Sequence, residues 1–531
     1  MVKYIQQFSV SEVIIMPNWL KDAVFYEIYP QTFCDSNGDG IGDIPGIISK
    51  LEYVKELGCN AIWLNPFYDS PFMDAGYDVR DYKKVAERYG TIDDVREMLK
   101  KAHSLGIRII FDLVPGHTSD QNEWFLKSKQ PGKNEFSGRY IWTDSVWEAP
   151  PQYRLLCGIT DRDGNYLVNF FSSQPALNYG FNEITHPAWQ KPTSDPDCIA
   201  TVEALKDIMR FWLDVGCDGF RVDMADSLVK NEDGEKPETC KIWKGIRKMM
   251  DEEYPDAALV SEWCNPKVSI GAGFHCDFYL DHDNNGYRIL FRNKDRKTGE
   301  TTAVFSKNGK GDITAFLDEY LSDLNATKDK GYISFITCNH DTPRMTKLFD
   351  KTEAKLAYSF IFMMPGVPFL YYGDEIGMKF MEGLTSKEGG FSRTGTRTPM
   401  QWDDTANHGF SSAPADKLYL PVDTSDDAVT VKAALEDPDS ILNTLKKVIE
   451  IRHANPDLQS DGEFEVIYAV KEKYPFIFKR GEFIIAVNPT NQEQSAPFAF
   501  DCDTVYELGS HEQKGSYMVM SAQTLSLLKI K

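Results

Sequence analysis

The sequence predicts an α/β protein: a (β/α)8 barrel of the TIM type, with an inserted subdomain after the third strand and a C-terminal antiparallel β domain. Eight short segments are almost continuously apolar, and helix-length amphipathic segments separate most of them. Strands of this composition are typical of a parallel sheet buried on both faces, and eight strand–helix units favour closure into a barrel. Beyond the last of these helices the pattern changes to strands with turn signals between them, as in a small antiparallel domain.

The expected strands alternate with segments that carry helix start and stop signals. One helix begins after Thr91, a residue type that caps helix N-termini, and another ends at Gly58. A chain of 531 residues is too long for one ordinary core, so two or three structural units are expected. The expected strands comprise residues 23–30, 61–66, 107–114, 217–224, 257–263, 274–280, 332–338 and 367–375.

One connection in this pattern is far longer than the others. Between "DLVPGH", which ends at His117, and a helix that begins at Cys198 lie about 80 residues rich in aromatic residues, glycine and proline. Structureless loops of that length are uncommon in compact domains, so an inserted subdomain is expected here. The predicted units are an N-terminal extension (1–16), the barrel (17–116 and 182–455), the inserted subdomain (117–181) and the C-terminal domain (456–531).

Charge and composition limit the class of partner. Lys and Arg number 58 against 80 Asp and Glu, a net charge of −22 that repels nucleic acid and anionic membranes and suits a neutral or cationic ligand. No apolar run reaches the roughly 20 residues needed to span a bilayer. The 10 cysteines form no CxxC pair, which is typical of free thiols in a reducing compartment, so a cytoplasmic location is expected.

Chemistry-bearing residues stand where the expected strands end. In "GCDGFRVDMAD", Arg221 and Asp223 directly follow an apolar run, although a charged pair there is unfavourable for a core. The carboxyl ends of barrel strands meet at one mouth, where barrel enzymes carry their active sites. The other polar residues at these ends are Tyr77, Asp78, Asp112, His117, Glu262, His340 and Asp341.

Four of these segments, "DLVPGH", "GFRVDMAD", "SEW" and "NHD", occur in order on the expected strands. This ordered set resembles glycoside hydrolase family 13, the α-amylase family, over nearly the whole chain. The resemblance implies cleavage of a glycosidic bond with retention, by a carboxylate and a carboxylic acid about 5–5.5 Å apart. It assigns Asp223 as nucleophile, Glu262 as general acid/base and Asp341 as transition-state stabiliser. Arg221 is expected to keep Asp223 ionised, and nearby carboxylates to raise the pKa of Glu262 so that it carries a proton near neutral pH.

The same resemblance implies roles for residues around the reacting pair. His117 and His340 are expected to donate hydrogen bonds to sugar hydroxyls, and Tyr77 to provide a stacking platform for the glycosyl ring. Asp112 stays open between a site residue and a structural residue that bonds the backbone around the site.

The segments "GYDV" and "GTRTPMQWD" resemble the branch of the family that contains oligo-1,6-glucosidases, α-glucosidases and trehalose synthases. In that branch an Asp and an Arg, at the positions of Asp78 and Arg397, close a pocket around the terminal sugar, which implies exo action. Met224, directly after Asp223, matches neither the Val associated with α-1,6 bonds nor the Ala or Thr associated with α-1,4 bonds. The linkage preference therefore stays open.

The leading interpretation is a retaining, exo-acting α-glucosidase that hydrolyses short α-linked oligosaccharides or disaccharides through a covalent glucosyl-enzyme intermediate. An α-glucosyl transferase or isomerase, either trehalose synthase-like or sucrose-acting, shares that intermediate, and an α-amylase is a further alternative. A non-catalytic amylase-fold protein is disfavoured because such proteins lack the acidic triad, which this chain keeps. The sequence does not determine the oligomeric state.

The segment "DSNGDGIGD" places hard oxygen donors at alternating positions of a glycine-rich loop, an arrangement that suits Ca²⁺. Oligo-1,6-glucosidase-like members of the family bind a structural calcium in a similar segment. A second calcium, common in α-amylases, is not expected, because Gly116 and Ala176 replace an Asn and an Asp of that site. The expected ligands are Asp35, Asn37, Asp39, Asp43 and the carbonyl of Ile41.

Overall fold

The computed structural model describes residues 16–281 and 285–531. At its centre eight parallel strands close into a barrel in the order β1-β12-β11-β10-β9-β8-β5-β2. Each strand lies within one of the eight predicted segments, so the barrel is confirmed. The strands are β1 (Phe25–Ile28), β2 (Ala61–Leu64), β5 (Arg108–Leu113), β8 (Gly219–Val222), β9 (Ala258–Ser261), β10 (Cys276–Tyr279), β11 (Tyr332–Ile336) and β12 (Val367–Tyr371).

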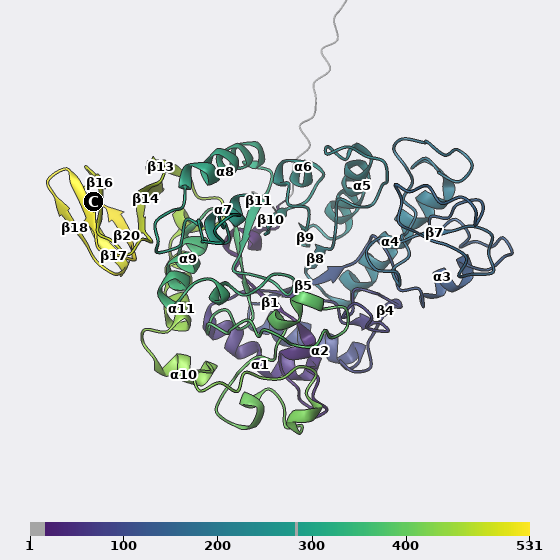
Figure 1. The fold of residues 1–531 in the computed structure, drawn as a ribbon, viewed down its shortest axis with the longest axis horizontal. Coiled ribbons are helices and arrows are strands. Elements are labelled where there is room, and N and C mark those ends of the chain that lie inside the picture. Colours follow the sequence, from purple (N-terminus) through teal and green to yellow (C-terminus); the bar gives the residue numbers. More distant parts are fainter. Residues whose placement is uncertain (1–15, 282–284) are drawn as a thin grey trace, which may run out of the picture.

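Helices surround this barrel (Figure 1). Local signals set their ends: Thr91 and Asp94 form a capping box at the start of α2, and Gly58 ends α1 in the left-handed conformation, with φ of 101°. The helices are α1 (Ile44–Leu57), α2 (Ile92–Ser104), α4 (Pro196–Val215), α5 (Pro237–Glu253), α6 (Pro266–Gly271), α7 (Gly286–Phe291), α8 (Ile313–Thr327), α9 (Lys351–Met363), α10 (Val431–Glu436) and α11 (Ile441–Ala454).

The strand register brings the polar residues at the strand ends to one level. Val222 of β8 pairs with Ser261 of β9. Asp223 and Glu262, which directly follow these two residues, therefore leave neighbouring strands side by side. On the closing side of the barrel, the ring of Phe25 stacks on Phe369 at a centroid distance of 4.2 Å.

The long connection between β5 and α4 contains structure of its own. It forms isolated bridges back to the barrel mouth, including one between His117 and Ala176. A small core formed by Ile141, Leu167, Ala176, Phe181 and Trp189 lies beneath it. Trp189, which lies beyond the expected boundary of the inserted subdomain at residue 181, belongs to this core. The boundary itself stays a prediction. The regular elements are α3 (Glu123–Ser128), β6 (Leu155–Leu156) and β7 (Tyr166–Leu167), and a separate hairpin of β3 (Tyr68–Asp69) and β4 (Asp81–Val85) follows β2.

The C-terminal strands form two antiparallel sheets at the end of the molecule opposite α3 and β7 (Figure 1). Arg480 donates hydrogen bonds to the backbone carbonyls of Met363 and Gln459 and so ties this domain to the end of α9. The predicted antiparallel domain is confirmed. The larger sheet contains β13 (Glu465–Val470), β14 (Lys473–Arg480), β15 (Phe483–Asn488), β20 (Thr524–Ile530) and β17 (Cys502–Leu508), and the smaller contains β16 (Gln494–Pro497), β19 (Tyr517–Met520) and β18 (His511–Lys514).

All 10 cysteines are free thiols, as the sequence predicts. Within the described ranges, no helix combines the length and apolarity required to cross a membrane.

Candidate active site

A cavity of about 210 Å³ opens at the carboxyl ends of the barrel strands, where barrel enzymes bind substrate. It is smaller than the roughly 300–1,000 Å³ typical of pockets for drug-sized ligands, and so suits one sugar ring better than a chain. Asp223, Glu262 and Asp341 all line it, so the three carboxyls that the sequence predicts at the barrel mouth lie around one cavity. The lining residues are Asp74, Tyr77, His117, Phe170, Asp223, Met224, Glu262, Asp341 and Arg393.

One buried guanidinium joins the carboxyls on β8 and β9. Arg221, with 1% of its side chain exposed, lies 2.7 Å from Glu262 Oε2, 2.8 Å from Asp112 Oδ1 and 3.3 Å from Asp223 Oδ1. The backbone N–H of Met224 also donates to Glu262 Oε2, at 3.1 Å. Two carboxyls paired with one planar cation line the same cavity, so a nucleophile and an acid/base could act there on one glycosidic bond.

The charge state of this pair differs from the sequence prediction. Burial and the neighbouring Glu262 carboxylate raise the pKa of Asp223 well above its usual value, although Arg221 lowers it. Arg221 lies closer to Glu262 than to Asp223. Arg221 favours the ionised form of Asp223, as predicted, but burial and Glu262 outweigh it, and its shorter ion pairs are to the other two carboxyls.

Asp341 lines the same cavity in a strongly cationic setting. Its Oδ1 is 2.7 Å from both Arg397 Nη2 and Arg393 Nη1, and its Oδ2 is 3.3 Å from His340 Nε2. Burial by itself raises its pKa, but His340 and the two arginines outweigh burial and hold the pKa well below the usual range. Asp341 is therefore a permanent carboxylate at any pH near neutrality.

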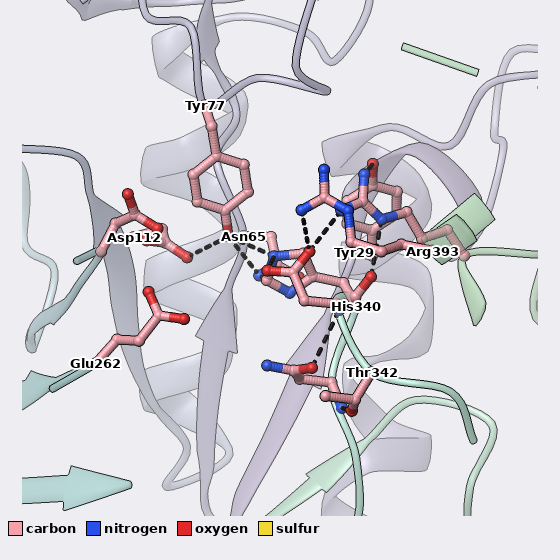
Figure 2. Close-up of polar contacts among 12 residues, drawn as sticks. Tyr29, Asn65, Tyr77, Asp112, Glu262, His340, Thr342 and Arg393 are labelled. Atoms are coloured by element: carbon pink, nitrogen blue, oxygen red, sulfur yellow. Dashed lines mark hydrogen bonds and ion pairs between the residues drawn. The ribbon is translucent and has the colours of Figure 1, made fainter. Parts of the chain in front are cut away.

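The hydroxyl of Tyr77 bridges Asp112 and His340 (Figure 2). Its hydroxyl lies 2.9 Å from Asp112 Oδ2 and 2.8 Å from His340 Nε2. Burial raises the pKa of Asp112 to about 6, although Arg221 and donors from Trp63 and Tyr77 lower it. Asp112 is fully buried and does not line the cavity, and its carboxylate accepts from the side chains of Trp63, Tyr77 and Arg221 rather than from backbone groups.

The two histidines are engaged within the protein. His117 Nε2 lies 3.1 Å from the carbonyl of Tyr77, and Nδ1 lies 3.1 Å from Asn169 Nδ2. His340 is fully buried and does not line the cavity. Burial lowers the pKa of His117 to about 4, so it is neutral. His117 lines the cavity and His340 does not, so the predicted bonds from both histidines to sugar hydroxyls stay a prediction.

The predicted pocket pair of Asp78 and Arg397 is also wrong. Asp78 is fully buried, and its carboxylate accepts the backbone N–H groups of Met73 and Asp74 at 2.8 and 3.0 Å. Arg397 donates to the carbonyl of His340 at 2.8 Å and forms an ion pair with Asp341 at 2.7 Å. Neither residue lines the cavity.

Asp74 and Arg393, each four positions earlier, take the places predicted for Asp78 and Arg397. Arg393 Nη2 lies 3.5 Å from Asp74 Oδ1, and Gln174 of the inserted segment donates to Asp74 Oδ2 at 2.8 Å. The Arg393 guanidinium lies 6.0 Å from the ring centre of Phe170. Burial raises the pKa of Asp74 to about 7, although Gln174 and Arg393 lower it. Asp74 and Arg393 each lie two positions before a quoted motif, "GYDV" and "GTRTPMQWD" respectively, and spacing alone does not tell which residue of a loop faces inward.

Met224 is a further lining residue whose role the sequence analysis left open. It adopts φ of 42°, which is an unusual conformation for a long side chain and places its N–H on Glu262.

The predicted calcium loop is folded around its own side-chain oxygens. Asp35 accepts the N–H groups of Asn37, Gly38 and Gly40, and the loop continues with Asn37 accepting from Asp39. Asp43 caps α1 through Gly46. Among the residues that the structure describes, no three acidic, His or Cys side chains are grouped to hold a metal by themselves. A calcium here would therefore depend on the Asn37 amide oxygen and a backbone carbonyl as well.

Comparisons with known proteins agree with this geometry. The family model of the α-amylase catalytic domain matches residues 27–461. The chain belongs to the α-amylase family, glycoside hydrolase family 13.

Relatives within this family act on several α-glucosides. The chain is 34% identical to the trehalose synthase/amylase TreS of Mycolicibacterium smegmatis, over 82% of this chain and 76% of that protein. It is 32% identical to the oligo-1,6-glucosidase of Parageobacillus thermoglucosidasius, over 87% of each chain, and 30% identical to the glucan 1,6-alpha-glucosidase of Streptococcus pneumoniae, over 90% and 92%. Among solved structures, the trehalulose synthase MutB of Pseudomonas mesoacidophila superposes with a TM-score of 0.80 at 25% identity, covering 97% of this chain and 99% of MutB.

Proposed function

We propose that this enzyme is a retaining, exo-acting α-glucosidase that hydrolyses short α-linked glucosides. The observation that carries the proposal is the one small cavity into which Asp223 and Glu262 both point while they share Arg221. Asp223 attacks the anomeric carbon, and Glu262 protonates the departing oxygen and later deprotonates the incoming water. Relatives named oligo-1,6-glucosidase and glucan 1,6-alpha-glucosidase support this reaction class.

The charge states define what substrate binding must accomplish. Attack requires Asp223 as a carboxylate and Glu262 as an acid, whereas the surroundings raise the pKa of Asp223. Binding of the sugar must therefore leave Asp223 ionised, which Arg221 favours because it lowers the pKa of Asp223. The permanent carboxylate of Asp341, in the same cavity, stabilises the positive charge that develops on the sugar ring.

The rim supports exo action. Arg393 and Gln174 both contact Asp74. These contacts join three segments of chain that are far apart in sequence at the edge of the cavity. A closed end beyond the first sugar accepts a chain terminus and excludes the interior of a long polymer. This arrangement argues against an α-amylase acting within chains.

Transfer of the glucosyl group to a sugar is the second candidate. The similarity to a trehalose synthase and to MutB, which is also solved as a variant in complex with sucrose, favours it. Both reactions use the same intermediate and differ in whether water or a hydroxyl of a sugar intercepts it.

Product analysis with the purified enzyme tests these proposals. Isomaltose, maltose, sucrose and trehalose are incubated separately, and the products are separated by chromatography. Hydrolysis predicts glucose with the α-anomer formed first, whereas isomerisation predicts a new disaccharide without net glucose. Absence of any reaction with the whole panel would contradict the proposed function.

We also propose that the loop of Asp35, Asn37, Asp39, Ile41 and Asp43 binds a structural Ca²⁺. No described Lys or Arg forms an ion pair with its three carboxyls, and their oxygens converge on the loop backbone. The ion would hold the loop against the start of α1 and take no part in bond cleavage. The free thiols support a cytoplasmic location as part of the same proposal.

A further inference from the structure

Arg88 lies outside the cavity but contacts two loops that supply residues to its rim. These are residues 70–80, here called the Asp74 loop, and residues 386–397, here called the Arg393 loop. Arg88 donates two hydrogen bonds to Glu388 of the Arg393 loop, from Nη1 to Oε1 at 2.8 Å and from Nη2 to Oε2 at 3.0 Å. The two side chains are 15% and 16% exposed, so water screens this bidentate pair less than it screens an exposed ion pair.

The same guanidinium lies over the ring of Phe72, which belongs to the Asp74 loop. Phe72 stands two positions before Asp74, and its ring centroid is 3.1 Å from Arg88 Cζ. A planar guanidinium can stack on an aromatic ring while it pairs with a carboxylate through two N–H groups, and a lysine ammonium cannot reproduce both contacts. Arg88 therefore joins one loop to the other.

The Asp74 loop is also fixed independently of Arg88. Asp78 accepts the backbone N–H groups of Met73 and Asp74 at 2.8 and 3.0 Å. The Arg393 loop packs closely against this fixed segment, since a Cβ atom added to Gly389 would lie 2.7 Å from the carbonyl oxygen of Met73. Loss of Arg88 is therefore expected to displace the Arg393 loop more than the Asp74 loop.

The backbone of the Arg393 loop depends on contacts that hold it in place. Glu388 and Phe391 both have positive φ, 44° and 45°, which is unfavourable for residues other than glycine. Besides Arg88, the hydroxyl of Tyr419 anchors this segment by donating to Glu388 Oε2 at 2.9 Å. Backbone in such a conformation persists only while its surroundings hold it, so removal of the ion pair allows the loop to relax.

Arg393 is linked to Glu388 through a short stretch of backbone. Arg393 Nη2 donates to the carbonyl of Gly389, directly after Glu388, at 2.8 Å, and lies 3.5 Å from Asp74 Oδ1. Arg393 Nη1 lies closer to its other carboxylate partner, at 2.7 Å from Asp341 Oδ1. A displacement of Glu388 is therefore expected to separate Arg393 from Asp74, its more distant partner, and to leave the ion pair with Asp341 in place.

We propose that Arg88 is a positioning residue for substrate recognition: through Glu388 it holds Arg393 against Asp74 and so keeps the cavity closed beyond the first sugar. Without Arg88, Glu388 keeps Tyr419 as a donor but loses its ion pair, and the Arg393 loop relaxes away from the Asp74 loop. This inference rests on the proposed function for what the rim excludes, but not for the contact between Asp74 and Arg393.

The kinetic test measures the ratio of the initial rate on long maltodextrins to that on the disaccharide that the enzyme cleaves fastest. In Arg88→Met this ratio is expected to rise about fivefold or more, because a small displacement of a recognition group changes rates strongly and an open rim admits longer chains. A loss of stability alone lowers both rates in proportion. An unchanged ratio overturns the proposal. If Arg88→Met does not fold, Glu388→Ala removes the same ion pair and is judged by the same criterion.

Two further variants separate positioning from stability. In the Arg393→Ala background, Arg88→Met should change the ratio less than about twofold, because its effect passes through Arg393. Arg210→Met is the matched control, since Arg210 of α4 pairs with Glu253 of α5 through two hydrogen bonds of 2.7 Å, away from the cavity. It should leave the ratio unchanged. A ratio that rises as much in Arg210→Met, or that still rises fully without Arg393, overturns the proposal.

A crystal structure of Arg88→Met gives a readout that needs no activity. Arg393 and Asp74 should lie beyond the ion-pair limit of about 4 Å, while Asp78 still binds the Asp74 loop; an unchanged distance between Arg393 and Asp74 overturns the proposal. If the original enzyme cleaves none of the α-glucosides but the variant loses this contact, the proposed function fails and the positioning role of Arg88 stands. If the enzyme cleaves them and the variant keeps the contact, the reverse holds.

Discussion

Removal of Arg221 tests most directly whether one cation holds the site together. In Arg221→Met the side chain keeps much of its length but loses the charge that lies within 2.7–3.3 Å of three carboxyls. Removing one partner of a buried ion pair costs about 3–5 kcal/mol, because the remaining charge stays buried without compensation. Arg221 and Asp112 are both essentially inaccessible to solvent, so solvent screening does not reduce this figure.

The pH dependence of that loss has a definite sign. Without Arg221, which lowers the pKa of both Asp112 and Asp223, the folded-state pKa values of these two carboxyls lie still further above their unfolded values of about 4. An acid whose pKa is raised on folding favours the folded state most below its unfolded pKa and loses this advantage as pH rises through its folded pKa. The destabilisation of Arg221→Met should therefore be larger at pH 8 than at pH 5.

Urea unfolding at both pH values measures this effect, and Asp112→Asn in the Arg221→Met background is the control. Removing the most buried of the three carboxyls should recover a large part of the lost free energy of unfolding, while activity stays low in both variants. If Arg221→Met is as stable as the original enzyme at pH 8, or if its loss is independent of pH, the electrostatic account of the site is refuted.

Three further predictions concern turnover, specificity and metal. Asp223→Asn should lower kcat at least about a thousandfold, as expected for loss of a covalent nucleophile. The variant should melt at the same or a higher temperature, because burial already disfavours the Asp223 charge. A near-normal kcat would exclude Asp223 as nucleophile. Arg393→Ala, which opens the rim beside Asp74, should raise the activity on long maltodextrins relative to disaccharides, as measured by reducing-end assays, and an unchanged ratio would contradict a pocket closed by Arg393. Chelation should lower the melting temperature, and Ca²⁺ should restore it, whereas Asp39→Ala should melt low in both conditions; a melt indifferent to chelator counts against the calcium site.

The barrel and its three facing carboxyls could be predicted because they depend on short-range patterns. Apolar strands followed by motifs fix where Asp223 and Glu262 leave the sheet, since parallel strands in register end at one level, and they place Asp341 in the loop after β11. Strand alternation then allows few choices for the direction of a side chain. The C-terminal sheets were predictable for the same reason, from turns that punctuate alternating segments.

Loop residues were not predictable in the same way. Asp78 and Asp74 share one loop, but the turn between them directs the carboxylate of Asp78 onto backbone N–H groups and that of Asp74 into the cavity. Arg397 and Arg393 exchange roles for a similar reason, because Arg393 lies inside a 3-10 segment (Phe391–Thr396) and Arg397 directly follows it. The backbone dihedral angles of the turns decide which residue of each loop faces the cavity. The hydrophobic periodicity of the sequence does not encode these angles.

The sequence alone therefore determined the architecture, the family and the carboxyl residues of the reaction, because each depends on contacts between neighbours along a strand or on the ordering of strands. The tertiary structure decided the charge states and partners: that Arg221 serves three carboxyls, that burial raises the pKa of Asp223, and that Arg88 pairs with Glu388 across 300 positions of chain. Electrostatic interactions depend on distance and burial in three dimensions, and neither quantity is encoded in the spacing of residues along the chain.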